Sequence, residues 1–212
     1  IVITGSGKSF CSGADLKWMK NAAKFTKSEN LIDAKKAGQL FKTLYLSQKP
    51  TIAKVNGSAF GGGLGLIAAC DIAIASKSST FSLSEVRLGL IPAMISPYIV
   101  KAVGARNAAR FMLTGERFNA DTALRIGLLQ KVMAAKHLDS GTEEIISELL
   151  KNGPNALKEC KNLLQWVSEK AIDDQLVNET AKRIALVRSS DEAKKGIEAY
   201  FNKEKPFWYK FR

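Results

Sequence analysis

The chain has 212 residues, 46% hydrophobic and 25% charged, which is enough apolar material for one large domain or a domain with an appendage. Its 32 Lys and Arg against 20 Asp and Glu give a net charge of +12, which permits binding to nucleic acid or to a small polyanionic ligand. The basic residues are spread along the chain without a dense cluster, so a solvated basic surface is favoured and nucleic-acid binding is not expected. No apolar run approaches the roughly 20 residues that cross a bilayer, so no membrane association is expected.

Cysteine and histidine exclude several kinds of site. Cys11, Cys70 and Cys160 are too few and too scattered for a disulfide framework or a zinc site. They indicate free thiols in a reducing, cytoplasmic compartment. His137 is the only histidine, and no Gly-x-Ser-x-Gly elbow is present, which argues against a Ser-His-Asp hydrolase. No metal, flavin or nicotinamide motif is found either.

The chain opens in a predicted strand, residues 1–4, without an initiator Met, which suggests that an N-terminal piece of the fold is missing. A connection over residues 9–16 then leads into a helix over 16–23 and offers backbone N–H donors near Gly13 and Ala14. Residues 25–30 are polar and are predicted to be mobile. Apolar residues at helical spacing predict a helix over 31–47.

The centre of the sequence is a strand–glycine–helix unit over residues 49–71. A β-prone run at 51–55 is followed by Gly61, Gly62 and Gly63 and then by a small, apolar, helix-compatible stretch over 64–70. Glycines let the backbone approach a ligand closely, and a helix N-terminus there would offer N–H groups to a developing negative charge. Tight strand–helix packing or a flexible turn explains the same glycines, and the residues alone do not decide between these interpretations.

Strands and helices continue to alternate up to about residue 137. The pattern predicts strands over 71–75, 80–82 and 127–133, and helices over 98–103, 105–113 and 120–126, with Gly104 as an interruption and Asn119 as a cap. Beyond residue 138 only helices are predicted, over 142–150, 156–169, 173–187 and 191–201. We therefore expect an α/β core over 1–137 and a helical region over 138–212, whose apolar faces pack on the core or on another subunit.

Three segments together resemble one family. They are SFCSGADL at 9–16, NG-x3-GGG at 56–63 ending in Cys70-Asp71, and FSLSEVRLGLIP at 81–92. With LTGE at 113–116 and the segment 199–206, they are similar in order and spacing to the crotonase (enoyl-CoA hydratase/isomerase) superfamily. The resemblance implies a crotonase (ClpP-like) β-β-α spiral with a C-terminal helical region that forms homotrimers or dimers of trimers.

The resemblance also implies roles for individual residues. The N–H groups of Ala14 and Gly62 would hold the thioester oxygen of an acyl-CoA substrate, and Glu85 would be the catalytic carboxylate. Coenzyme A would enter as part of the substrate, with no separate cofactor and no metal. The residues expected around the acyl-CoA are Cys11, Ser12, Gly13, Asp15, Leu16, Gly61, Gly63 and, near the CoA phosphates, Lys203.

Two departures from the family pattern bear on the reaction. Hydratases with two glutamates carry the second one at the position of Gly65, so Glu85 would act alone or with another group. The run AMISPY at 93–98 replaces a glycine-rich run, and together with the segments 10–19 and 63–67 it most resembles bacterial methylglutaconyl-CoA hydratase-like proteins. Such a substrate ends in a carboxylate, which Arg87 could meet; pairing of Arg87 with a nearby acid is the alternative.

Three functions follow from these features. The first is hydration of an α,β-unsaturated, short branched acyl-CoA such as 3-methylglutaconyl-CoA, a lyase reaction. The second is an enoyl-CoA isomerase that uses Glu85 to shift the double bond. The third is a non-catalytic scaffold that binds RNA or a protein, for which the net charge of +12 is the motivation.

Overall fold

The computed structural model describes residues 1–210, which form two compact units. The first unit contains Ile1–Ser47 and Thr51–Thr142; the second contains Gln48–Pro50 and the chain from Glu143 onward. The sequence predicts a boundary between residues 137 and 138. The first compact unit ends five residues later, at Thr142. Within residues 1–210, no helix combines the length and the apolar character that crossing a membrane requires.

The first unit contains two four-stranded sheets. One consists of parallel strands in the order β1 (Val2–Thr4), β3 (Ile52–Val55), β5 (Ile72–Ser76) and β8 (Lys131–Met133). The other has the order β2 (Ser9–Cys11), β4 (Ser58–Phe60), β6 (Thr80–Ser82) and β7 (Phe118–Asn119), with only the last pair antiparallel. Strands of the two sheets alternate along the chain, and helices follow each of the first three pairs, so the predicted β-β-α spiral is confirmed.

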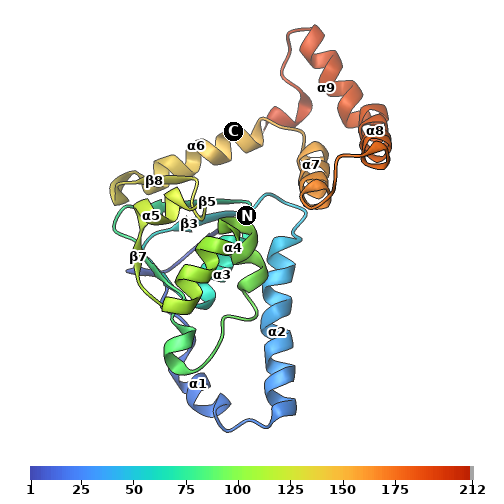
Figure 1. Ribbon diagram of the computed structural model, residues 1–212. Coiled ribbons are helices and arrows are strands. Elements are labelled where there is room, and N and C mark those ends of the chain that lie inside the picture. Colours follow the sequence, from blue (N-terminus) through green and yellow to red (C-terminus); the bar gives the residue numbers. More distant parts are fainter. Residues whose placement is uncertain (211–212) are drawn as a thin grey trace. The chain divides into compact units, whose positions relative to one another are not determined.

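Helix α3 (Gly62–Ala69) is the central helix of this unit and contacts both α2 (Lys27–Tyr45) and α4 (Ser96–Thr114) (Figure 1). The core around it is apolar, and Leu64 and Ile67 of α3 are almost fully buried with Phe81 of β6. The remaining helices are α1 (Leu16–Ala22), α5 (Ala120–Arg125) and two short 3-10 turns, η1 (Glu85–Leu88) and η2 (Ala135–His137).

The prediction of a mobile segment at 25–30 is wrong, because α2 already begins at Lys27. The Thr26 hydroxyl accepts a hydrogen bond from the N–H of Glu29, and the Glu29 carboxylate accepts one from the N–H of Thr26. This reciprocal capping box satisfies two N–H groups that a helix start leaves unpaired and so fixes the first turn. The hydrophobic pattern at 31–47 does not contain this signal.

One other boundary differs from the prediction. Strand β8 begins at Lys131 and not at residue 127, because Gly127 adopts a φ of +88° in the turn that follows α5. The predicted interruption at Gly104 is confirmed, since α4 consists of two helical stretches joined by a kink at this residue, with φ 74° and ψ 156°.

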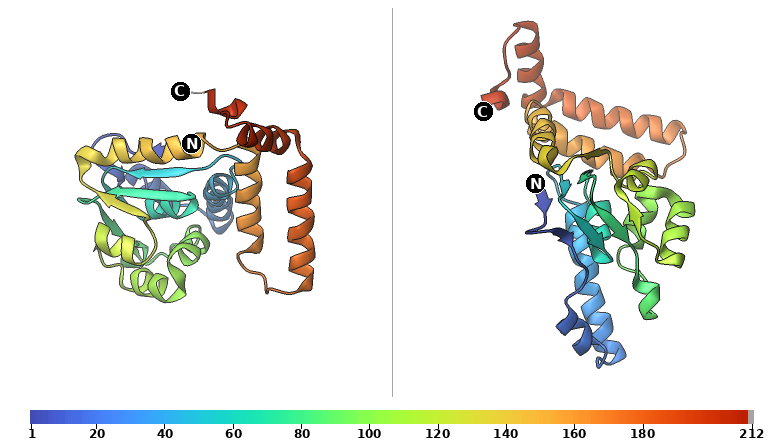
Figure 2. Two further views of the ribbon diagram at one scale, coloured as in Figure 1. Left: turned by 90° about the horizontal axis from the view of Figure 1, so that it is seen from above. Right: turned by 90° about the vertical axis from the view of Figure 1, so that its left-hand side faces the viewer.

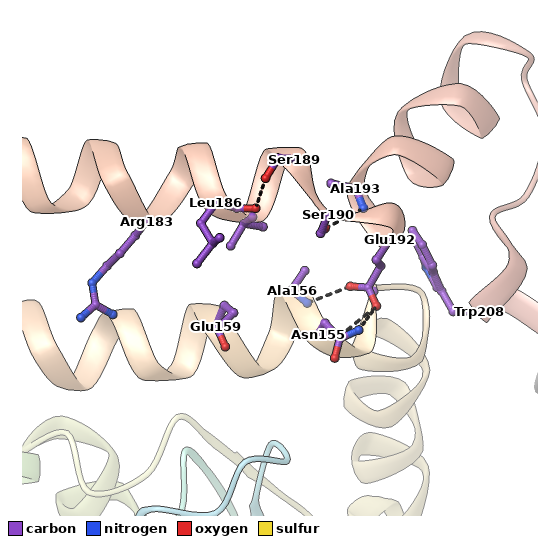
Figure 3. A pocket seen from close by; sticks show the side chains of 12 residues that line it. Asn155, Ala156, Glu159, Arg183, Leu186, Ser189, Ser190, Glu192, Ala193 and Trp208 are labelled. Atoms are coloured by element: carbon purple, nitrogen blue, oxygen red, sulfur yellow. Dashed lines mark hydrogen bonds between the residues drawn. The ribbon is translucent and has the colours of Figure 1, made fainter.

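The second unit is helical, as predicted for the C-terminal region. Helix α6 (Leu138–Leu150) starts in the first unit and ends in the second, and α7 (Pro154–Val167), α8 (Asp174–Ser189), α9 (Asp191–Phe201) and the 3-10 turn η3 (Phe207–Lys210) follow. Helices α7 and α8 lie side by side and antiparallel (Figure 2). A cavity of about 460 Å³ lies between α7, α8 and α9 (Figure 3).

A buried carboxylate holds the start of α7 to the start of α9. Glu192 is only 9% exposed, and its oxygens accept hydrogen bonds from the backbone N–H groups of Asn155 and Ala156 and from the Asn155 side chain (Figure 3). An acidic group at a helix N-terminus also interacts favourably with the helix dipole. The lack of a side chain at Gly153 permits this approach. A Cβ there would lie only 2.9 Å from the carboxylate carbon of Glu192, which is too close for two carbon atoms.

Replacing Glu192 by Ala should destabilise the protein by roughly 3 kcal/mol, because two N–H groups at the start of α7 would lose a charged acceptor. Urea unfolding followed by circular dichroism measures the difference. Glu198→Ala, on the exposed side of the same helix, is the matched control and should change the free energy of unfolding by less than about 0.5 kcal/mol. Equal effects of the two substitutions would contradict this role of Glu192.

Candidate active site

The turn between β4 and α3 has a conformation that only glycine adopts readily. Gly61 has φ 52° and ψ −121°, and its N–H donates a hydrogen bond to the carbonyl oxygen of Ser82 at 3.0 Å. A Cβ on Gly61 would lie 3.2 Å from the carboxylate oxygen Oε1 of Glu85. The glycine therefore serves both the backbone conformation and the close approach of an acidic side chain, and the turn is not a loose connection.

Glu85 is the first residue of η1, directly after the β6 segment, and is half-buried. Its oxygen Oε2 is buried and has no hydrogen-bond partner among residues 1–210. Burial raises the pKa of the Glu85 carboxyl above its ordinary value, and a hydrogen bond from its own backbone N–H opposes this only in part. A buried acid with a raised pKa and a free oxygen is suited to taking up and releasing a proton.

Two backbone N–H groups, one in the turn beside Glu85 and one in the segment after β2, are also unpaired. Gly62 is the first residue of α3, and its N–H makes no hydrogen bond within the part of the chain that the structure describes. The same holds for the N–H of Ala14, which follows Gly13 (φ +108°) and precedes Asp15, the N-cap of α1. These are the two donors that the sequence predicts for an oxyanion site.

The structure brings some of the other predicted site residues to this turn. Cys11 of β2 packs under Gly63, where a Cβ would lie 2.8 Å from that of Cys11. Ser12 and Gly13 follow β2, and Asp15 accepts a hydrogen bond from the N–H of Trp18 at 2.8 Å. Leu16 is 80% exposed at the start of α1. Their contacts with CoA stay predictions.

Lys203 lies in the second unit, just after α9, with a φ of 57° and an exposed side chain. Its expected contact with CoA phosphates also stays a prediction. Within residues 1–210, no group of three or more His, Cys, Asp or Glu side chains could hold a metal ion.

Apolar side chains fill the space that the side chain of a second glutamate, at position 65, would need. A Cβ on Gly65 would lie 2.1 Å from Cγ2 of Ile95 and 2.9 Å from Cε1 of Phe41. The Phe41 ring also lies 3.7 Å from the position that a Cβ on Gly62 would take. The missing carboxylate is therefore replaced by packed hydrocarbon next to the predicted oxyanion donor, and no room remains for an acid in its place.

A polar cavity of about 210 Å³ lies beside Glu85, and the sequence did not predict it as a whole. It is lined by Ser12, Phe60, Ser82, Ser84, Arg87, Gly115 and Arg117. Arg87 makes no ion pair within the described residues, so the alternative that it pairs with a nearby acid does not hold there. Arg117 carries no sequence signal for such a site, because its role depends on neighbours that only the fold supplies.

Comparisons with known proteins agree with this geometry. The family model described as enoyl-CoA hydratase/isomerase matches residues 1–210, so the chain belongs to this family. One similar solved structure is that of a Legionella pneumophila protein assigned as an enoyl-CoA hydratase/isomerase (crotonase). It is 48% identical in sequence, and its TM-score is 0.92. The match covers 98% of this chain and 80% of the Legionella chain. The predicted membership in the crotonase superfamily is thus confirmed.

Two curated relatives carry named hydratase activities. The short-chain-enoyl-CoA hydratase of Clostridium acetobutylicum is 34% identical over 100% of this chain and 80% of its own. The 2,3-dehydroadipyl-CoA hydratase of Escherichia coli is 31% identical over 97% of this chain and 78% of its own.

Adding a side chain at position 65 should destabilise the protein. Gly65→Ala places a methyl group against Ile95 and should cost about 1–3 kcal/mol in the free energy of unfolding, and Gly65→Glu should cost more. In an Ile95→Ala background the cost of Gly65→Ala should fall, because the two residues compete for the same space. Gly38→Ala, which meets nothing within 4 Å on α2, is the control and should be neutral or stabilising. Additive effects at 65 and 95 would contradict this packing.

The buried carboxyl of Glu85 should make stability depend on pH. Its folded-state pKa is raised, so the ionised form lowers stability above that pKa, and the penalty disappears below the unfolded value of about 4.3. Glu85→Gln should therefore have a higher Tm than the wild type at pH 8, with the difference shrinking toward pH 4. Glu29→Gln should show the opposite sign at pH 8, since the Thr26 N–H and hydroxyl lower the pKa of Glu29. Melting curves at several pH values test both, and a Glu85→Gln protein less stable than wild type at pH 8 would contradict the assignment.

Proposed function

We propose that this protein is a lyase that adds water to an α,β-unsaturated acyl-CoA thioester. The observation that carries the proposal is one buried, unpaired carboxylate oxygen, on Glu85, beside a turn whose N–H at Gly62 is also unpaired. A buried polar atom without a partner is costly, so the free oxygen of Glu85 indicates that a bound molecule completes its hydrogen bonds. Membership in the enoyl-CoA hydratase/isomerase family supports the same reaction class.

In this reaction the N–H groups of Ala14 and Gly62 bind the thioester oxygen. Water adds to the β-carbon, and the electrons of the carbon–carbon double bond move toward the thioester, so that this oxygen becomes enolate-like. Two preorganised donors stabilise the negative charge more strongly than they stabilise the neutral substrate, which lowers the barrier. Because backbone groups do this work, small residues at positions 14 and 62 are sufficient.

Glu85 acts as the general base and then as the general acid. Its ionised form takes one proton from the attacking water as the C–O bond forms at the β-carbon, and its protonated form returns a proton to the α-carbon. The sum is water added across the double bond, with Glu85 back in its starting state. A pKa raised by burial makes the carboxylate a stronger base and keeps its proton available for the second step. Since Ile95 and Phe41 close the position of a second acid, this one carboxylate performs both steps.

For the acyl group we propose a short branched chain such as that of 3-methylglutaconyl-CoA. The support is the resemblance of segments 10–19, 63–67 and 93–98 to methylglutaconyl-CoA hydratase-like proteins. CoA is part of the substrate, and no further cofactor is required by the chemistry above. We place Cys11–Leu16, Gly61 and Gly63 beside the acyl-CoA, and Lys203 at its phosphates.

Double-bond isomerisation is the second candidate. The closed position at Gly65 favours it, because moving a proton between two carbons requires one base and no bound water. A shifted double bond without a hydroxyacyl product would identify this reaction.

We also propose a homotrimer or a dimer of trimers in the cytoplasm. Large apolar side chains of the second unit are exposed in the single chain, including Leu186 at 75%, Tyr200 at 78% and Phe201 at 77%. Large exposed apolar side chains such as these are covered when subunits associate.

The test is a hydration assay that follows loss of the conjugated enoyl-thioester absorbance. Wild type should hydrate crotonyl-CoA and, faster, 3-methylglutaconyl-CoA, whereas Glu85→Gln should lose roughly 10²- to 10⁴-fold in kcat because general acid–base catalysis is removed. Asp121→Asn, an exposed acid on α5, is the control for loss of a carboxylate elsewhere in the first unit.

Product analysis separates the candidates. A hydroxyacyl-CoA product supports hydration, and a shifted double bond supports isomerisation. Full activity of Glu85→Gln, or binding of CoA esters without turnover of any of them, would overturn the proposed function.

A further inference from the structure

We propose that Arg87 and Arg117 form an anion-binding subsite next to the reacting centre, which takes a carboxylate or phosphate group of the acyl-CoA substrate. This inference rests on the proposed function and names the substrate group that these residues recognise. Its ligand is either a carboxylate at the far end of the acyl chain or a phosphate of CoA, and the chemistry of recognition is the same for both.

The cavity beside Glu85 presents donors and no acid. Besides the two guanidinium groups, its lining contains the hydroxyl groups of Ser12, Ser82 and Ser84. The Ser82 hydroxyl already donates a hydrogen bond to the carbonyl oxygen of Gly115 at 3.0 Å. The hydroxyl groups of Ser12 and Ser84 are therefore the ones available to a ligand. A cavity lined by two cations and hydroxyl groups, without a carboxylate, favours an anionic ligand.

The two arginines are held in place without being neutralised. The Arg117 guanidinium lies over the Phe60 ring at 5.4 Å, and Arg87 packs against Gly115, where a Cβ would come within 3.1 Å of its Nε. No ion pair involves either residue within the described chain. Packing thus orients both side chains and leaves their fork-shaped donors open to a ligand.

Arg110 provides a contrast, because it is paired with an acid. Glu116 accepts hydrogen bonds from Nε and Nη2 of Arg110 at 2.7 and 3.3 Å, so the acid next to Arg117 in sequence is already occupied. Ion pairing raises the pKa of Arg110 and lowers that of Glu116. The neighbouring Arg117 keeps its charge uncompensated.

The cavity lies on the same three segments that supply the proposed reacting groups. Ser84 directly precedes Glu85, Ser12 precedes Ala14 by two residues, and Phe60 precedes Gly62 by two. A volume of about 210 Å³ is below the roughly 300–1,000 Å³ of pockets that take a whole ligand, so it suits an end group of a substrate and not a complete nucleotide.

The experiment compares Arg87→Gln, Arg117→Gln and the double variant with wild type, and uses Arg106→Gln, an exposed arginine of α4 outside the cavity, as the charge-matched control. The readout is kcat/KM for 3-methylglutaconyl-CoA, crotonyl-CoA and crotonyl-pantetheine. These substrates carry, respectively, a distal carboxylate with CoA phosphates, CoA phosphates alone, and neither.

If the subsite binds the acyl carboxylate, the ratio of kcat/KM for 3-methylglutaconyl-CoA to that for crotonyl-CoA should fall about 10-fold for each single variant and further for the double variant. If it binds a CoA phosphate, both CoA esters should lose about 10-fold while crotonyl-pantetheine is unchanged. Arg106→Gln should alter neither ratio by more than about twofold.

The subsite is overturned if the double variant keeps wild-type values for both CoA esters, or if it loses activity equally on all three substrates. The second result would indicate damage to the fold, which thermal unfolding would show as a lower Tm. If wild type turns over none of the substrates, the proposed function fails separately. Calorimetric titration with 3-methylglutaryl-CoA and with CoA then still tests the subsite, and equal Kd values for wild type and the double variant would reject it.

Discussion

The whole site depends on how closely helix α3 approaches its neighbours. Two of its residues lack side chains at the points of contact: Gly63 faces Cys11 of β2, and Gly65 faces Ile95 and Phe41. A methyl group at either position would come within 3.0 Å of heavy atoms that cannot easily move. Because β2 can therefore pack directly against α3, the segment that leads from β2 to Ala14 starts beside the first turn of α3, which carries Gly62. The glycines of this segment therefore have two roles: they form the turn, and they allow α3 to pack closely against its neighbours.

Two carboxylates, those of Glu192 and Glu85, show opposite uses of the same chemical group. Glu192 is surrounded by donors and accepts three hydrogen bonds, so it stabilises the second unit. Glu85 has one oxygen with no partner within residues 1–210, and its burial raises its pKa. An unsatisfied buried polar atom costs about 1–3 kcal/mol. In the proposed reaction the same desolvation makes Glu85 a stronger base, whereas Glu192 has no proton to transfer and is fully hydrogen-bonded.

Local sequence signals predicted much of the fold, and the failures have identifiable causes. The start of α2 was missed because the capping box at Thr26 and Glu29 is polar and precedes the apolar pattern. Strand β7 has only two residues and exists through its pairing with β6, which no local pattern encodes. At the site, motif resemblance identified Glu85 and the departure at Gly65. It could not show that Ile95 and Phe41 fill the vacated space, or that Arg117 and Arg87 share a cavity, because those contacts join residues far apart in sequence.

The raised pKa of Glu85 agrees with a carboxyl group that is not ion-paired to the arginines of the proposed anion subsite. Arg87 is only two residues from Glu85, and a nearby guanidinium would lower the pKa of a carboxyl group. Burial is nevertheless the largest cause of the shift, and among the described residues neither arginine contributes to it. In a 3-10 turn with three residues per turn, positions two apart project to different sides, so Glu85 and Arg87 of η1 face different surroundings. A cationic cavity can therefore attract an anionic substrate group without ion-pairing the base, which stays desolvated and able to exchange its proton.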